Sequence, residues 1–140
     1  MATYRIGQAA KELDVSVHTL RYYEKHGYLR ASGRTESNYR IYTESDLDSA
    51  RFIVRARKIG FSLNEIQTFL SIRANKDQHT CREAKAIAQA KIEEVTQKIH
   101  ALQQMLSDLH QLSDACCGGK ESAENCTILK ALDHSKEDLP

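Results

Sequence analysis

The chain has 140 residues, enough for one ordinary domain or a small domain with an appendage. No segment approaches the roughly 18 consecutive apolar residues that a membrane span needs, and the first residues lack the apolar core of a secretory signal. We therefore expect a cytoplasmic protein without a membrane partner, whose thiols stay reduced.

The net charge of +1 conceals an uneven distribution along the chain. Residues 1–60 carry eleven Lys and Arg against seven Asp and Glu, whereas residues 61–140 carry nine against twelve. All six tyrosines lie within the first 42 residues. A basic, tyrosine-rich front half is typical of a segment that meets a polyanion, so the two halves are expected to do different work.

Two short helices joined by a tight turn are expected near the start. The first carries apolar residues at helical spacing, from Ile6 to Leu13. Ser16 is suited to cap the second, which covers about 17–26 and ends at Gly27. This arrangement predicts a helix-turn-helix. Its candidate DNA-binding residues are Ser16, His18, Thr19, Arg21, Tyr22 and Tyr23.

The next segment, "RASGRTESNYRIYTE", alternates in the manner of a two-strand ribbon. Such a ribbon can be an ordinary surface hairpin. Directly after a helix-turn-helix, a wing that reaches over a phosphate backbone is the favoured interpretation, with Arg34, Tyr39 and Arg40 as its candidate DNA contacts. Two scaffold helices follow, one capped by Thr43 and ending at Gly60, the other opened by a capping box at Ser62.

A long helix is expected from Cys81 to about Ser113. Thr80 and Glu83 form a capping box that makes Cys81 its first residue. Apolar residues then recur at alternating steps of three and four, at Ile92, Val95, Ile99, Leu102, Leu106 and Leu109. This narrow stripe is a heptad seam that needs a partner helix, and the chain has no second helix of like length. A second copy of the chain is the expected partner.

Continued toward the start of the helix, the spacing of three and four residues reaches Cys81, so this thiol lies near the side that faces the partner. Which part of the partner it meets then depends on the orientation of the two copies. In a parallel pair, Cys81 would face its own copy, far from the other thiols. In an antiparallel pair centred near Ile99, it would lie beside the partner's "CCGGKESAENC" loop. The four cysteines would then form one shared cluster at each end of the dimer.

Four thiols, Cys81, Cys116, Cys117 and Cys126, are the candidate metal ligands. A thiol in the first turn of a helix is favoured as thiolate, the form that binds metal. Thiolates bind soft or borderline ions such as zinc, cadmium, lead, mercury or copper(I). A third thiolate suits a divalent ion better than copper(I), so zinc is the first candidate for the bound metal. The alternatives are a buried cysteine that only packs and a strained disulfide between adjacent cysteines.

Four segments together resemble the MerR family of metal-responsive transcription regulators: "IGQAAKELDVSVHTLRYYEKHGYL", "YRIYTESDL", "ARKIGFSLNEI" and the cysteine-bearing tail. The "HTC" that opens the long helix and the "DACCG" tail are most similar to the zinc-responsive, ZntR-like branch. The resemblance covers almost the whole chain.

The resemblance implies a mainly α-helical homodimer. A winged helix-turn-helix DNA-binding head with its connecting helices would cover residues 1–76, an antiparallel coiled-coil dimerisation helix 77–114, and a metal-binding loop with a short helix 115–140. It also implies that the dimer distorts promoter DNA when metal binds, so that RNA polymerase can engage the promoter.

One departure from the family bears on the metal. The zinc-responsive branch has a histidine in the loop where this chain has Glu121, so Glu121 or His134 would have to serve a second ion, or the site holds one. Cadmium, lead and mercury stay open as alternatives to Zn²⁺. The copper(I) branch is disfavoured because its members lack a cysteine where Cys81 stands.

A rival hypothesis from another class is a zinc-buffering protein. An enzyme is not indicated, because no nucleophile–base set, paired carboxylates or glycine-rich phosphate loop occurs in the sequence.

Overall fold

The computed structural model describes residues 2–134, which divide into two compact units. The first ends at Lys91 and is called the head; the second begins at Ile92 and is called the tail. The head holds β1 (Thr3–Tyr4), α1 (Ile6–Leu13), α2 (Val17–Lys25), β2 (Gly33–Arg34), β3 (Arg40–Thr43), α3 (Glu44–Lys58), α4 (Leu63–Ala74) and the 3₁₀ turn η1 (Lys76–Gln78). Helix α5 (Cys81–Asp114) runs from the head into the tail, and η2 (Ala123–Asn125) and α6 (Thr127–His134) complete the tail.

The predicted helix-turn-helix is confirmed in α1 and α2. Asp14 adopts a left-handed conformation with φ 55°, which ends α1 and turns the chain sharply. Ser16 then caps α2, because its side-chain oxygen accepts a hydrogen bond from the backbone N–H of Thr19 at 3.0 Å. The buried faces of both helices enter the same core.

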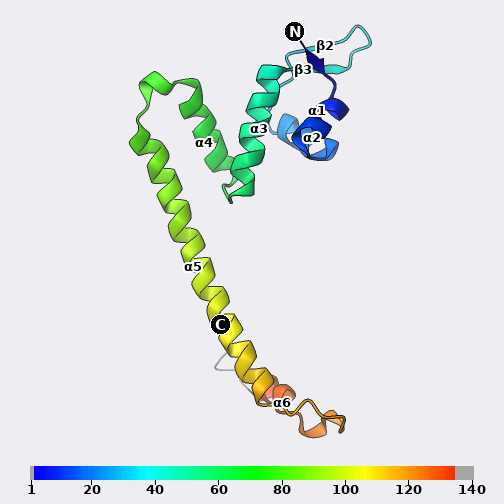
Figure 1. Ribbon diagram of the computed structural model, residues 1–140, viewed down its shortest axis with the longest axis vertical. Helices are drawn as coiled ribbons and strands as arrows, with labels where there is room; N and C mark the ends of the chain where they lie inside the picture. The colour runs from blue at the N-terminus through cyan, green and yellow to red at the C-terminus, as the bar shows by residue number, and fades with distance from the viewer. Residues whose placement is uncertain (1, 135–140) are drawn as a thin grey trace. The chain divides into compact units, whose positions relative to one another are not determined.

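The ribbon is also confirmed, and it belongs to a three-stranded antiparallel sheet of order β1-β3-β2. Gly33 pairs with Ile41 and Arg34 with Arg40, while Thr3 of β1 pairs with Thr43 on the other side of β3. The loop between β2 and β3 projects from the head as the expected wing (Figure 1). Strand β1 was not predicted, because two residues are too few to show an alternating pattern.

Helices α3 and α4 begin at the caps read from the sequence, and both caps are capping boxes in the structure. At each start the hydroxyl of Thr43 or Ser62 accepts the N–H of the third helical residue, and that residue's carboxylate accepts the cap's own N–H. Thr80 and Glu83 exchange the corresponding bonds at the start of α5, so Cys81 is its first residue, as predicted. The most deeply buried large side chains of the core are Leu20, Tyr42, Leu47, Ile53 and Ile66.

The first turns of α5 pack on the head. Ile87 and Ala88 lie against its core. Lys91 is only 8% exposed, and its amine lies 3.0 Å from a carboxylate oxygen of Glu65 in α4. Because Glu65 also closes the α4 capping box, one carboxylate ties the end of the head segment of α5 to the start of α4.

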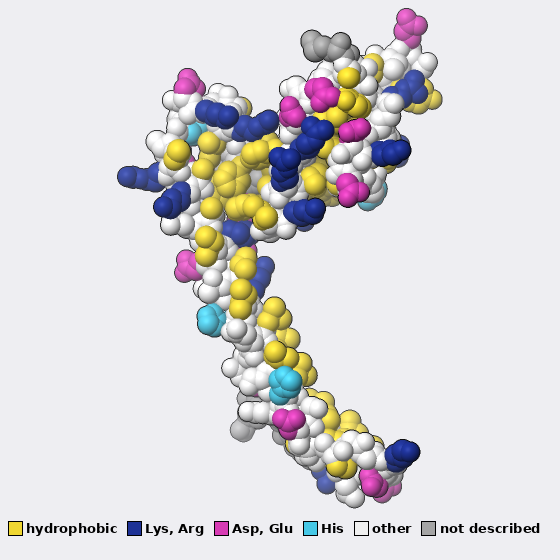
Figure 2. Space-filling model, in the orientation of Figure 1, with side chains coloured by type: hydrophobic (Ala, Val, Ile, Leu, Met, Phe, Trp, Pro, Cys, Tyr) yellow, Lys and Arg dark blue, Asp and Glu magenta, His cyan; other side chains and the backbone are white. Residues whose placement is uncertain are grey.

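In the tail, the apolar stripe of α5 is exposed in the single chain. The exposed fractions are 63% for Ile92, 39% for Val95, 49% for Ile99, 61% for Leu102, 55% for Leu106 and 60% for Leu109. Figure 2 shows these hydrophobic side chains along the helix. A row of large apolar side chains left in water is typical of an interface, which agrees with the predicted seam. No helix within residues 2–134 is both long and apolar enough to cross a membrane.

Candidate DNA-binding head and thiol cluster

The outer face of α2 presents most of the side chains predicted to read DNA. His18, Arg21 and Tyr22 are exposed, and the Tyr22 ring lies 4.3 Å, centroid to centroid, from His26 at the end of the helix. Ser16 and Thr19 are joined by a 2.8 Å bond between their hydroxyls, so these two side chains fix the start of the helix. The helix therefore offers a polar, partly aromatic face of the kind that enters a groove of DNA.

Tyr23 lies elsewhere. Its side chain is 7% exposed and belongs to the core beside Leu20 and Leu29, and burial raises its pKa. The sequence placed Tyr23 with the DNA-reading residues because it lies on the second helix of the helix-turn-helix. One residue is a turn of about 100° on a helix, so neighbours in sequence face different surroundings. Tyr23 is a packing residue in this structure.

The wing is held in form by its own polar side chains. Arg34 donates through Nη1 to the backbone carbonyl of Asn38 at 3.2 Å, and Asn38 takes the left-handed conformation with φ 69°. The N–H of Tyr39 donates to the hydroxyl of Thr35 at 3.1 Å. The Tyr39 ring is 57% exposed on this frame, with the guanidinium of Arg5 4.6 Å from its centroid.

Arg40, the third predicted wing residue, is engaged within the head. Its Nε atom lies 2.6 Å from a carboxylate oxygen of Glu24 in α2, and the other oxygen of Glu24 accepts a hydrogen bond from the Tyr42 hydroxyl at 2.8 Å. Burial and this hydrogen bond both raise the pKa of Tyr42. Sequence reasoning missed the role of Glu24 as the partner of Arg40. The signal that could have found it is its acidic charge in an otherwise basic helix.

Two of the four thiols lie together in the tail. The half-buried side chains of Cys116 and Cys126 are within hydrogen-bonding reach of each other. Cys126 directly precedes α6, and the backbone N–H groups of Leu129 and then Ile128 lower the pKa of its thiol, with a smaller contribution from Cys116. Gly118, at φ 69°, turns the chain so that its N–H donates to the sulfur of Cys116 at 3.5 Å.

The other two thiols are exposed: Cys117 next to Cys116, and Cys81 at the start of α5. The Glu121 carboxylate lies so close to Gly119 that a Cβ atom added there would clash with it. The side chain of His134 lies outside the described residues. Within residues 2–134 of one chain, no group of three or more His, Cys, Asp or Glu side chains is arranged to hold a metal ion. The donors nevertheless fit a soft or borderline divalent ion, because Cys116 and Cys126 meet and Cys126 is biased toward thiolate.

Comparison with known proteins places the head and the long helix in one family. Residues 4–71 match the MerR HTH family of regulatory proteins, and residues 47–112 match the MerR DNA-binding region. The chain is 48% identical to the HTH-type transcriptional regulator ZntR of Escherichia coli (strain K12) over 93% of this chain and 92% of that protein.

Two solved structures are similar along nearly the whole chain. The transcription regulator PbrR691 from Ralstonia metallidurans CH34, in complex with lead(II), gives a TM-score of 0.80 at 33% identity and covers 92% of this chain and 98% of that one. HiNmlR, a MerR family regulator lacking the sensor domain and bound to promoter DNA, gives a TM-score of 0.57 at 27% identity over 99% and 98%. The chain therefore belongs to the MerR family of metal-responsive transcription regulators, which are not enzymes, and its likeness to ZntR supports the ZntR-like branch.

Proposed function

We propose that this chain acts in the cytoplasm as a homodimer that binds promoter DNA and activates transcription when Zn²⁺ binds to thiols of both chains. The observation that carries the proposal is the pairing of an exposed apolar stripe on α5 with an incomplete thiol cluster at its end. Each of these features is completed by a second copy of the chain.

The stripe supplies the reason to dimerise. The free energy gained by burying a large apolar side chain is about 1.5–3 kcal/mol, and six such residues lie on one face of α5. Because the seam contains no charged position to set a direction, the proposed antiparallel pairing depends on the thiols rather than on the stripe.

The thiols supply that direction. Cys81 and Cys116 are separated along the chain by the whole of α5, so a parallel pair would keep them at opposite ends. An antiparallel pair would bring Cys81 of one chain to the Cys116, Cys117 and Cys126 loop of the other. A bound zinc ion would then tie the two chains together through thiolates.

Zinc is favoured over other divalent ions because of the ZntR-like sequence. Cadmium, lead and mercury bind the same thiolates, and the similar PbrR691 was solved with lead(II). With any of these metals, binding would change how the two heads sit on the DNA. The promoter would then be distorted so that RNA polymerase can engage it. A coupling free energy of about 1–3 kcal/mol between metal and DNA conformation gives a several-fold to hundredfold switch.

The test is a metal titration read out by transcription. Footprinting on the DNA upstream of the gene defines the candidate promoter, and purified protein with polymerase is then titrated with Zn²⁺, Cd²⁺, Pb²⁺ and Hg²⁺. We expect Zn²⁺ to raise transcription, and Cys81→Ser to abolish the rise while DNA binding persists. A zinc-buffering protein would take up the metal with no footprint and no change in transcription.

A further inference from the structure

A groove of about 900 Å³ opens on the head between the start of α1, helix α2 and the wing. Three arginines line it from three different elements: Arg5 before α1, Arg21 on α2 and Arg40 on β3. Tyr39 of the wing forms part of the same lining. Arg5 was not among the DNA contacts expected from the sequence.

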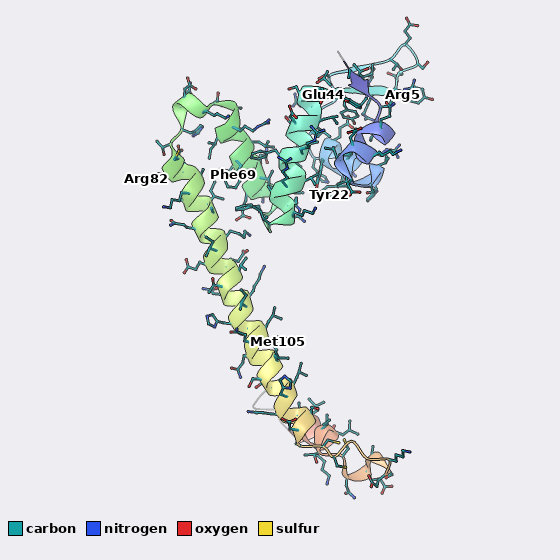
Figure 3. The ribbon with its side chains drawn as sticks, viewed as in Figure 1. Arg5, Tyr22, Glu44, Phe69, Arg82 and Met105 are labelled. Atoms are coloured by element: carbon teal, nitrogen blue, oxygen red, sulfur yellow. The ribbon has the colours of Figure 1, made fainter. Side chains whose placement is uncertain are left out.

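The backbone of Arg5 is held firmly. It follows β1, which pairs with β3, and its N–H donates to the side-chain oxygen of Gln8 at 2.9 Å in the first turn of α1. The side chain then lies over the Tyr39 ring at 4.6 Å, at the edge of the head beside the wing (Figure 3). Because a guanidinium on an aromatic face keeps its N–H groups free at the edges, this contact orients Arg5 without occupying its hydrogen-bond donors.

The three arginines differ in how their charge is balanced. Arg40 is paired with Glu24 at 2.6 Å. Arg5 and Arg21 form no ion pair with a carboxylate among residues 2–134. Two exposed, uncompensated cations therefore face one groove, which suits an anion that can accept from both.

We propose that Arg5 is a DNA-backbone contact and that Tyr39 is the aromatic platform that positions it. This inference rests on the proposed DNA-binding function and adds a residue to it. Arg5 and Arg21 would reach phosphates of the same segment of the DNA backbone in the groove. The stacking of Arg5 on Tyr39 would connect the wing to the residues just before α1. The role of Tyr39 is then that of a positioning residue acting through its ring.

The test measures the affinity of the full-length protein for a 30-base-pair duplex of mixed sequence across a range of salt concentrations. Arg5→Ala and Arg5→Gln should each weaken binding about tenfold or more at moderate salt. They should also reduce the slope of log affinity against log salt by about 2 for a dimer, because each lost phosphate contact contributes about 0.9. Thermal melting followed by circular dichroism checks the fold of both variants. Both should fold, because the backbone N–H of residue 5 can still donate to the side-chain oxygen of Gln8.

Tyr39 variants separate the ring from its hydroxyl. Tyr39→Phe should bind as the wild type does, Tyr39→Ala should bind as weakly as Arg5→Ala, and the double variant Arg5→Ala/Tyr39→Ala should be no weaker than Arg5→Ala alone. Lys76→Ala, which removes an exposed charge in η1, is the charge-matched control and should leave affinity and slope unchanged.

Two results would overturn the inference while leaving the proposed function intact: a wild-type slope in both Arg5 variants, or a Tyr39→Phe defect as large as that of Tyr39→Ala. Failure of the wild-type protein to bind any duplex would instead refute the proposed function itself.

Discussion

The Nε atom of Arg40 in strand β3 lies 2.6 Å from a carboxylate oxygen of Glu24 in helix α2. Since Glu24 also accepts a hydrogen bond from the hydroxyl of buried Tyr42, one carboxylate joins the candidate recognition helix to the central strand of the sheet. The wing and the recognition helix are thereby held as one body.

Glu24→Gln is expected to lower the free energy of unfolding of the head by about 1–2 kcal/mol. The amide can still accept from Tyr42, but the charge that holds Arg40 is lost. The Glu24 side chain is only 16% exposed, so water compensates little of this loss. Urea denaturation followed by circular dichroism provides the measurement.

The matched control for this substitution is Asp48→Asn. It also removes one carboxylate paired with an arginine, Arg51 at 3.1 Å, but the aspartate is 60% exposed. Its effect should stay within about 0.5 kcal/mol. Equal effects of the two substitutions would show that the Glu24 link contributes no more than a surface ion pair.

Leu102→Glu is expected to weaken dimerisation by about a hundredfold or more, because each of two chains would place a charge in the apolar seam. Leu102 is 61% exposed in the single chain, so the fold of the monomer should survive. Sedimentation measures the association, and circular dichroism the fold. Gln103→Glu adds the same charge at the next residue and should leave the dimer intact; dissociation in both variants would indicate a general charge effect rather than a seam.

The stability of the head should depend on pH through Glu65. The N–H of Ser62 and the amine of Lys91 lower the pKa of this carboxyl. A carboxyl with a lowered pKa in the folded state contributes stability above its unfolded pKa of about 4.3, and the contribution is lost as pH falls through the folded value. Glu65→Gln should therefore be less stable than wild type at neutral pH.

The stability gap between wild type and Glu65→Gln should close in acid. Denaturant titrations at about pH 7 and about pH 3 measure it. A gap of equal size at both pH values would mean that the charge of Glu65 contributes nothing and that the capping hydrogen bonds account for the whole effect.

Local signals predicted most of the fold. Capping boxes at Thr43, Ser62 and Thr80 specify helix starts through side-chain hydrogen bonds within three residues, and the structure has helices at all three. The apolar stripe is likewise a local period. Strand β1 was missed because its existence depends on pairing with Thr43 and Tyr42, about forty residues away.

The site was predicted less completely, for the same physical reason. Residue type pointed to His18, Arg21 and Tyr22, which lie on an accessible face of the structure, but type alone could not separate Tyr22 from buried Tyr23. The contacts of Arg5 with Tyr39 and of Arg40 with Glu24 join distant segments, so no local pattern announces them. The metal ligand set and the domain boundaries at 76 and 114 stay predictions.

The most direct test of the central claim is zinc binding to mixed dimers. Cys81→Ser subunits keep the loop thiols, and subunits with Cys116, Cys117 and Cys126 all changed to Ser keep only Cys81. Neither homodimer has a complete site under the proposed arrangement, and each should bind Zn²⁺ weakly in competition with a chelator. Mixed dimers should regain one tight site per dimer, because one chain's Cys81 then meets its partner's intact loop. If mixing restores no tight site, the ligands do not come from both chains and the antiparallel, shared-cluster account is wrong.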